Sequence, residues 1–274
     1  MSQKKPIKVA IASQKGGGGK STITMLLANK LYFERKKKVL IVDCDIPQNS
    51  CAGIRQDELS KLGTISEKLR KVNDGEEDAD IITNDEKTLW KLFEKAYQQH
   101  PGVKEEFAIE IPHVQGNTLE DVAKQVKAYE EKEVDVILFD TVGSISNRAY
   151  LELMKQMDFI FVPIEAEESA LKPAISSLSA FKNLSGVSAY GFFNKFKLAE
   201  TEQKKCMINV LTIALKLNLP LLTVNNEPLY MEDKACFRSP LVKSSLFPAI
   251  EIKAYKNSEG NKLISTMCKT ILKK

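Results

Sequence analysis

Short apolar runs alternate with amphipathic stretches along most of this chain. Runs rich in β-branched residues and bounded by small or polar residues are typical of buried parallel strands. They cover residues 7–13, 38–45, 134–140, 159–165, 188–196 and 219–224. Apolar residues at helical spacing follow the first run, over 21–38. Residues 7–45 therefore predict a βαβ unit, and its continuation predicts an α/β fold: a doubly wound, mostly parallel sheet flanked by helices.

The middle of the chain has a less regular pattern. Residues 86–99 predict an amphipathic helix, 106–114 a strand and 118–133 a second helix, in which Thr118 and Asp121 have capping-box spacing. The polar segment 66–80 predicts a loop around Asp74 and Gly75. Because neither a repeat nor a long linker interrupts the pattern, we expect one domain over residues 1–274.

Composition narrows the class of protein. Of 274 residues, 43% are hydrophobic and 28% are charged, which is typical of a soluble globular protein. No apolar run reaches the roughly 18 residues of a membrane-spanning helix, and the apolar part of the N-terminus is too short for a signal peptide. We therefore expect a cytoplasmic protein. Five scattered cysteines and two histidines disfavour a zinc or iron–sulfur site.

The stretch SQKGGGGKST at residues 13–22 predicts a phosphate loop between the first strand and the first helix. Glycines let backbone N–H groups approach an anion closely, and a helix N-terminus favours negative charge. In this motif Lys20 reaches the β- and γ-phosphates and the Ser21 hydroxyl ligates Mg²⁺. We therefore predict ATP and Mg²⁺ as cofactors. The predicted nucleotide-binding residues of the loop are Lys15, Gly16, Gly17, Gly18, Gly19, Lys20, Ser21 and Thr22.

The loop departs from the usual motif at Gln14, where glycine is the rule. It matches K-G-G-x-x-K-[ST] instead and so resembles the deviant phosphate loop of the ParA/MinD family of ATPases, closest to the ParA-type partition ATPases. The resemblance implies a P-loop NTPase fold and a homodimer that sandwiches ATP. It also implies that Lys15 reaches the partner subunit's ATP, as an arginine finger does. A solvated surface lysine is the alternative.

Two further segments resemble the family's switch regions. Residues 42–50 resemble the first switch, with Ile46 before the proline, and imply that Asp45 orients water or holds a Mg²⁺-bound water. Asp43 would support it, or would only end the strand. Residues 136–144 resemble the Walker B strand and imply that Asp140 binds Mg²⁺ through water. The catalytic candidates are Lys15, Lys20 and Asp45, and the metal candidates are Ser21, Asp45 and Asp140.

The resemblance extends to two segments beyond Asp140. Residues 161–173 resemble a segment that helps to build the dimer face, and Val142 and Gly143 replace the prolines that usually follow the Walker B aspartate. Asn194 ends an apolar run, where ligands sit in such sheets. In relatives with an asparagine here, its amide recognises adenine. An exposed asparagine at the start of a loop is the alternative.

The C-terminal part of the chain is basic. From Met231 onward, nine basic residues stand against four acidic ones. ParA-type ATPases bind DNA non-specifically through such residues, by contacts that are salt-dependent. The resemblance implies a nucleoid-associated ATP form, a role in segregating or positioning plasmid, chromosomal or mobile-element DNA, and a stimulating ParB-like partner. With residues 236–248, the pattern looks most like ParA-like proteins encoded beside Bacteroides conjugative elements. The DNA-binding candidates are Arg238, Lys243, Lys253 and Lys256.

A MinD-like membrane-associated positioning ATPase is the alternative function. Residues 261–274 predict an amphipathic helix that would lie on a membrane or pack on the protein core, but they lack bulky aromatic residues. Membrane binding is therefore the weaker interpretation of residues 261–274. Metal-cluster carriers with a similar loop would need suitably placed cysteines, and residues 161–173 disfavour the related small-molecule ligases.

Overall fold

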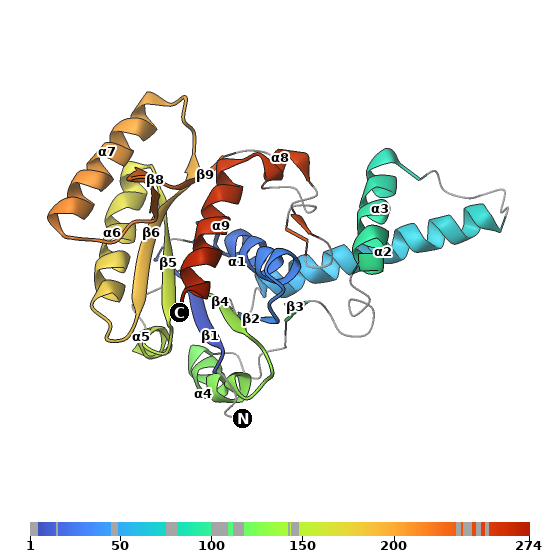
Figure 1. The fold of residues 1–274 in the computed structure, drawn as a ribbon, viewed down its shortest axis with the longest axis horizontal. Helices are drawn as coiled ribbons and strands as arrows, with labels where there is room; N and C mark the ends of the chain where they lie inside the picture. Colours follow the sequence, from blue (N-terminus) through green and yellow to red (C-terminus); the bar gives the residue numbers. More distant parts are fainter. Residues whose placement is uncertain are drawn as a thin grey trace.

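The computed structural model describes residues 5–14, 16–44, 49–74, 82–99, 109–111, 118–141, 143, 148–233, 237, 243–244, 248–249 and 252–274. A seven-stranded sheet lies at its centre, and its described strand pairs are all parallel (Figure 1). From one edge to the other the strands are β3 (Ile109–Glu110), β2 (Val39–Asp43), β4 (Val136–Asp140), β1 (Ile7–Ile11), β5 (Phe159–Glu165), β6 (Ser188–Phe196) and β9 (Tyr230–Glu232).

Helices cover both faces of this sheet. Val9 and Ile11 face one core with α1 (Lys20–Asn29), its π-helical continuation η1 (Lys30–Glu34), and the C-terminal helices α8 (Lys253–Lys256) and α9 (Glu259–Leu272). Ala10 and Ala12 face the other core, with α4 (Leu119–Glu130), α5 (Arg148–Met154) and α6 (Glu168–Lys182). Next to α6 lies α7 (Thr201–Lys216). The alternation of inward positions along β1 is that of a strand buried on both faces. The predicted doubly wound α/β fold is confirmed.

Several predicted elements appear with nearly the predicted bounds. The strands over 159–165 and 188–196 match β5 and β6 residue for residue, and 134–140 contains β4. At the start of α4, the Thr118 hydroxyl accepts from the Asp121 N–H at 3.3 Å, and the Asp121 carboxylate accepts from the Thr118 N–H at 3.2 Å. The predicted capping box is therefore confirmed.

The predicted strand over 219–224 is wrong in extent. Only Leu221 forms an isolated parallel bridge, to Gly191 of β6. The chain then turns into an antiparallel hairpin of β7 (Thr223–Val224) and β8 (Glu227–Pro228). Asn225 and Asn226 connect them with φ of 52° and 66°, the left-handed geometry of a tight hairpin turn. This turn brings the chain back, so that β9 takes the place at the sheet edge.

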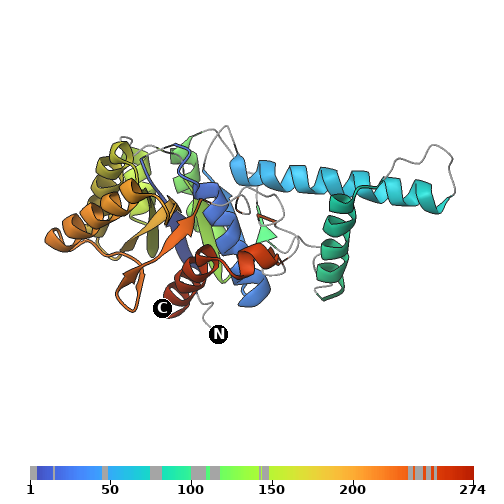
Figure 2. The same cartoon turned by 90° about the horizontal axis from the view of Figure 1, so that it is seen from above.

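Two long helices project from the sheet (Figures 1 and 2). The first is α2 (Ser50–Asn73), which the sequence did not predict, and the second is α3 (Asn84–Gln99), predicted over 86–99. Leu62 and Ala96 are the buried centre of the apolar cluster between them, and Trp90 and Phe93 pack around it. Asp74 follows α2 directly, and Gly75 of the predicted loop lies outside the described residues. We call α2 and α3 the arm.

The first and last helices depart from expectation in different ways. The helix predicted over 21–38 is α-helical only to Asn29, and after η1 the chain turns at Lys36, where φ is 55°. The C-terminal helix α9 forms as predicted, and its apolar residues Leu263, Met267 and Ile271 are fully buried in the core. No helix within the described ranges is long and apolar enough to cross a membrane.

Candidate functional site

The phosphate loop joins the carboxyl end of β1 to the N-terminus of α1. Gly17 and Gly19 both have left-handed φ values, of 70° and 74°. A Cβ atom on Gly19 would lie 2.8 Å from Nδ2 of Asn194, so any side chain there would have to displace the Asn194 amide. Gly19 immediately precedes α1, and its carbonyl accepts the N–H of Ile23 at 3.0 Å. The loop therefore has the tight backbone and the helix N-terminus that a phosphate group needs.

This geometry gives a prediction for the loop. Gly19→Ala is expected to lower the free energy of unfolding by about 1–3 kcal/mol and to weaken nucleotide binding, because the new methyl group adds both a strained φ and a clash. Urea denaturation and a nucleotide titration measure the two effects. Gly186→Ala is the matched control, since Gly186 also has a left-handed φ, of 77°, but precedes β6 away from the loop, and a Cβ there meets no atom within 4 Å. Equal effects of the two substitutions would contradict this account of the loop.

Two aspartates lie beside the loop at the same edge of the sheet. Asp43 ends β2 and Asp140 ends β4, and the two are direct partners in the strand register. Asp140 is also the register partner of Ile11, the last residue of β1. Both carboxylates are buried, with exposures of 2% and 1%. Adjacent parallel strands thus bring two acidic groups to the start of the phosphate loop.

The Asp140 carboxylate is surrounded by hydroxyl and thiol groups. It bonds the Ser21 hydroxyl, accepts from Cys51 Sγ at 3.3 Å, and lies 3.5 Å from the Thr24 hydroxyl. Burial raises the pKa of Asp140 to about 6; the charge of Asp43 also raises it, and the Ser21 bond and the Lys20 charge lower it. A buried carboxylate whose negative charge is only partly compensated, touching a serine hydroxyl, has the oxygen donors that Mg²⁺ prefers. These residues fit a magnesium ion.

Asp43 does more than end its strand. Its Oδ2 accepts the backbone N–H groups of Cys51, at 2.7 Å, and Ala52, at 3.2 Å. These are among the N–H groups that the start of a helix leaves without a partner, so Asp43 caps α2 from a neighbouring element. A carboxylate of the site therefore caps the N-terminus of α2, the first helix of the arm.

Cys51 is a member of the site that the sequence did not indicate. Burial first, and then the charges of Asp140 and Asp43, raise the pKa of its thiol well above its usual range. The thiol stays protonated and donates to Asp140 while its own N–H donates to Asp43. One residue at the start of α2 thus contacts both acidic groups. Its separation of 89 positions from Asp140 explains why no local pattern revealed it.

The remaining predicted residues fall into three groups: those beside the loop, the DNA-binding candidates, and those outside the described residues. Lys20 is 8% exposed, and Asn194 is 4% exposed. The Asn194 side chain donates from Nδ2 to the Gly18 carbonyl at 2.7 Å, so it packs on the phosphate loop rather than on the surface. Its adenine contact stays a prediction.

The DNA-binding candidates that the structure describes take no part in the described contacts of the loop. Lys253 and Lys256 are exposed on α8, and Lys243 is half-buried. Lys15, Asp45, Val142 and Arg238 lie outside the described residues.

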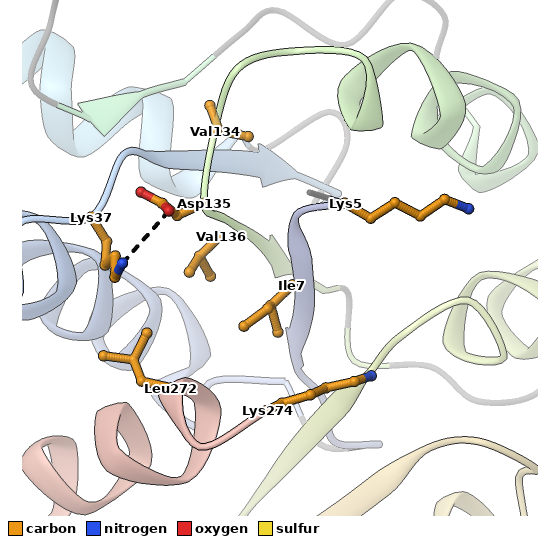
Figure 3. Close-up of a pocket in the computed structure, with 8 residues that line it drawn as sticks. All are labelled: Lys5, Ile7, Lys37, Val134, Asp135, Val136, Leu272 and Lys274. Atoms are coloured by element: carbon orange, nitrogen blue, oxygen red, sulfur yellow. Dashed lines mark ion pairs between the residues drawn. The ribbon is translucent and has the colours of Figure 1, made fainter. Parts of the chain in front are cut away.

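A small cavity of about 120 Å³ lies at the amino-terminal ends of the central strands, opposite the phosphate loop. Ile7 and Val136, at the amino ends of β1 and β4, line it, and Lys37 pairs with Asp135 at 3.6 Å beside it (Figure 3). The side chain of Lys5 points away from it. This cavity is therefore separate from the phosphate loop.

Comparisons with known proteins agree with this geometry. A family model described as an AAA domain matches residues 7–186. No curated protein sequence matches the chain. Among solved structures, a plasmid partition protein from Borrelia burgdorferi is similar, with 17% identity, a TM-score of 0.55, and coverage of 98% of this chain and 99% of that chain.

Two MinD proteins have similar folds as well. MinD from Aquifex aeolicus is 17% identical, with a TM-score of 0.59 and coverage of 98% of both chains. MinD from Pyrococcus horikoshii, solved in complex with Mg-ADP, is 18% identical, with a TM-score of 0.56 and coverage of 97% of this chain and 96% of that chain. The chain therefore belongs to the AAA-domain family whose model covers residues 7–186, and its fold is similar to those of the partition and MinD proteins.

Proposed function

We propose that residues 1–274 form one domain, a Mg-ATP-dependent dimerising ATPase of the ParA type that binds DNA non-specifically to segregate or position it. The observation that carries the proposal is the placement of buried Asp140 against Ser21, at the start of the helix that follows the phosphate loop. The similar MinD from Pyrococcus horikoshii was solved with Mg-ADP, which supports the same ligands here.

Several of the groups that would hold the nucleotide lie within the described residues. Backbone N–H groups of the loop and the N-terminus of α1 attract the phosphates, and Lys20 adds a positive charge at the first position of the helix. Ser21 and Asp140, with Asp45, would hold Mg²⁺, whose charge would offset the negative charge of the phosphates. Asp45 orients the attacking water. Lys15 approaches the nucleotide of the partner subunit.

The arm offers a route from this site to the basic C-terminal segment. Asp43 caps the N-terminus of its helix α2, and Glu58 in the same helix accepts a hydrogen bond from the Ser244 hydroxyl. Asn29 of α1 also holds this segment, donating to the Ser244 carbonyl at 2.8 Å. Lys243, a DNA-binding candidate, is the adjacent residue. We infer that a nucleotide-dependent shift of α2 reaches this segment and alters DNA affinity.

The packing of α9 disfavours the alternative function, a MinD-like ATPase that binds a membrane through residues 261–274. Leu263, Ile264 and Met267 are fully buried in the core beneath the sheet, so inserting them into a membrane would require α9 to leave the protein. Deleting residues 261–274 would therefore test folding rather than membrane binding. Replacing the exposed Lys262 and Lys269 by glutamate leaves the core intact and is the better liposome co-sedimentation variant.

Lys15→Ala tests the proposed dimer. The variant is expected to bind ATP but to lose ATP-dependent dimerisation, and to hydrolyse ATP on the order of 10³-fold more slowly, because a cation supplied across an interface contributes on that scale. Sedimentation velocity with a non-hydrolysable ATP analogue and a phosphate-release assay measure the two effects. Lys216→Ala, an exposed lysine of α7, is the control. A dimer unchanged by Lys15→Ala would show that Lys15 does not act across the interface.

A further inference from the structure

Lys195 occupies an unusual backbone position at the end of β6. Its φ is 54°, in the left-handed region, where a residue with a side chain is strained. The pairing of β6 with β9 shifts register between Phe193 and Phe196, as at a β-bulge. Bulges turn a side chain out of the strand's normal alternation. The strained backbone therefore aims the Lys195 side chain in a direction that a regular strand would not allow.

The ammonium group of Lys195 makes two short contacts. Nζ lies 2.6 Å from Glu165 Oε1 and donates to the carbonyl of Gly17 at 2.7 Å. The Glu165 side chain is 7% exposed, whereas that of Lys195 is 48% exposed. Glu165 ends β5 beside Asn194, its register partner on β6. A nearly buried carboxylate thus fixes the ammonium group against the phosphate loop.

Two consecutive residues of β6 hold two consecutive carbonyls of the loop. Lys195 binds the Gly17 carbonyl, and Asn194 binds the Gly18 carbonyl at 2.7 Å. In a planar trans peptide the C=O and the following N–H point in opposite directions. Holding the carbonyls of Gly17 and Gly18 therefore directs the N–H groups of Gly18 and Gly19 the other way. Backbone N–H groups of successive residues that point to a common site are what bind phosphate.

We propose that Lys195 is a positioning residue of the nucleotide site: with Glu165, it clamps the Gly17 carbonyl and so orients the Gly18 N–H toward the phosphates. The clamp rests on the proposed function in that nucleotide is the ligand. It acts through the backbone of the loop and not by contact with the phosphates. Because nothing in the clamp depends on the γ-phosphate, it serves ATP and ADP alike.

Substitutions of the pair distinguish this clamp from direct phosphate binding. Both Lys195→Ala and Glu165→Gln are expected to weaken Mg-ATP and Mg-ADP binding by about 10-fold, as loss of a charge-assisted hydrogen bond does, and the double variant should be no weaker than either. If Lys195 instead contacted the phosphates, Glu165→Gln would release the ammonium group and strengthen binding. That strengthening would overturn the clamp.

Lys195→Gly separates the clamp from a merely structural role. Glycine tolerates the left-handed backbone, so this variant is expected to melt at a higher temperature than Lys195→Ala while binding nucleotide equally weakly. Lys195→Arg, which keeps a cationic donor, should restore most of the affinity. Lys197→Ala is the matched control, because Lys197 is 47% exposed and pairs with Glu200 and Asp233 rather than with the loop.

Isothermal titration of the full chain with Mg-ATP and with Mg-ADP gives the result. Affinity lowered by Lys195→Ala and by Glu165→Gln, but not by Lys197→Ala, supports the clamp. Affinity unchanged in the first two variants, while the wild-type protein binds nucleotide, overturns the clamp alone. A wild-type protein that binds neither nucleotide overturns the proposed function and the clamp with it.

Discussion

Asp140→Asn is expected to stabilise the nucleotide-free protein while removing most of its Mg²⁺-dependent affinity for nucleotide. Burial raises the pKa of Asp140 to about 6 from an ordinary 3.8. At pH 7 the folded state therefore carries an ionised carboxylate in a buried environment that disfavours its charge. This difference corresponds to about 3 kcal/mol. Asparagine has a similar shape without the charge, so we expect a gain of about 1–3 kcal/mol in urea denaturation at pH 7.

The sign of the pH dependence follows from the direction of the shift. Because the folded-state pKa is raised, the contribution of Asp140 to stability is fully present below about pH 4 and is lost as the pH rises through about 6. The advantage of Asp140→Asn should therefore disappear when denaturation is repeated near pH 4. Mg²⁺-dependent nucleotide affinity should fall by about 10- to 100-fold, since in the proposed site the carboxylate would hold the ion through water.

Asp43→Asn is the matched control, because it is the same chemical change on the adjacent strand. Asp43 accepts two backbone N–H groups at the start of α2, so losing its charge should destabilise the protein by about 1 kcal/mol. The two substitutions are thus expected to have opposite signs. A loss of stability in Asp140→Asn at pH 7 would mean that the carboxylate is better compensated than its contacts indicate.

Lys20→Ala is expected to give the largest loss of nucleotide binding, roughly 10²- to 10³-fold. Lys20 is a buried cation at the start of α1, close enough to Asp140 to lower its pKa. Removing one partner of a desolvated charge interaction typically has this effect. Titration with a fluorescent ATP analogue measures the loss.

Lys30→Ala is the matched control for Lys20→Ala. Lys30 follows α1 and is also buried, with 3% exposure, but it bonds Glu34 and Asn261 away from the phosphate loop. Its loss should lower stability and leave nucleotide affinity unchanged. If both substitutions weaken nucleotide binding equally, the Lys20 side chain supports the folded state and does not bind the phosphates.

The elements that the sequence predicted are those whose pattern is local. The runs 159–165 and 188–196 are almost wholly buried strands, so their apolar bounds coincide with β5 and β6. The capping box at Thr118 needs only two residues three positions apart. The phosphate loop likewise shows its chemistry in consecutive residues.

What escaped prediction depends on contacts between distant segments. The helix α2 has few buried residues because much of it projects beyond the sheet, where Leu59 and Leu62 pack on α3. The roles of Cys51 and Lys195 depend on partners 89 and 178 positions away. No local pattern indicates a left-handed Lys195 or a thiol bonded to Asp140.

Binding to plasmid DNA, measured across a salt series with ATP, with ADP and without nucleotide, tests the central claim most directly. The ATP-bound protein is expected to bind tightly at low salt and to lose affinity linearly on a logarithmic salt scale, whereas the other two forms bind weakly. Replacing Lys253 and Lys256 together by alanine should reduce the slope by about two. Equal affinity in all three nucleotide states, or no affinity even at low salt, would contradict an ATP-controlled DNA-binding switch.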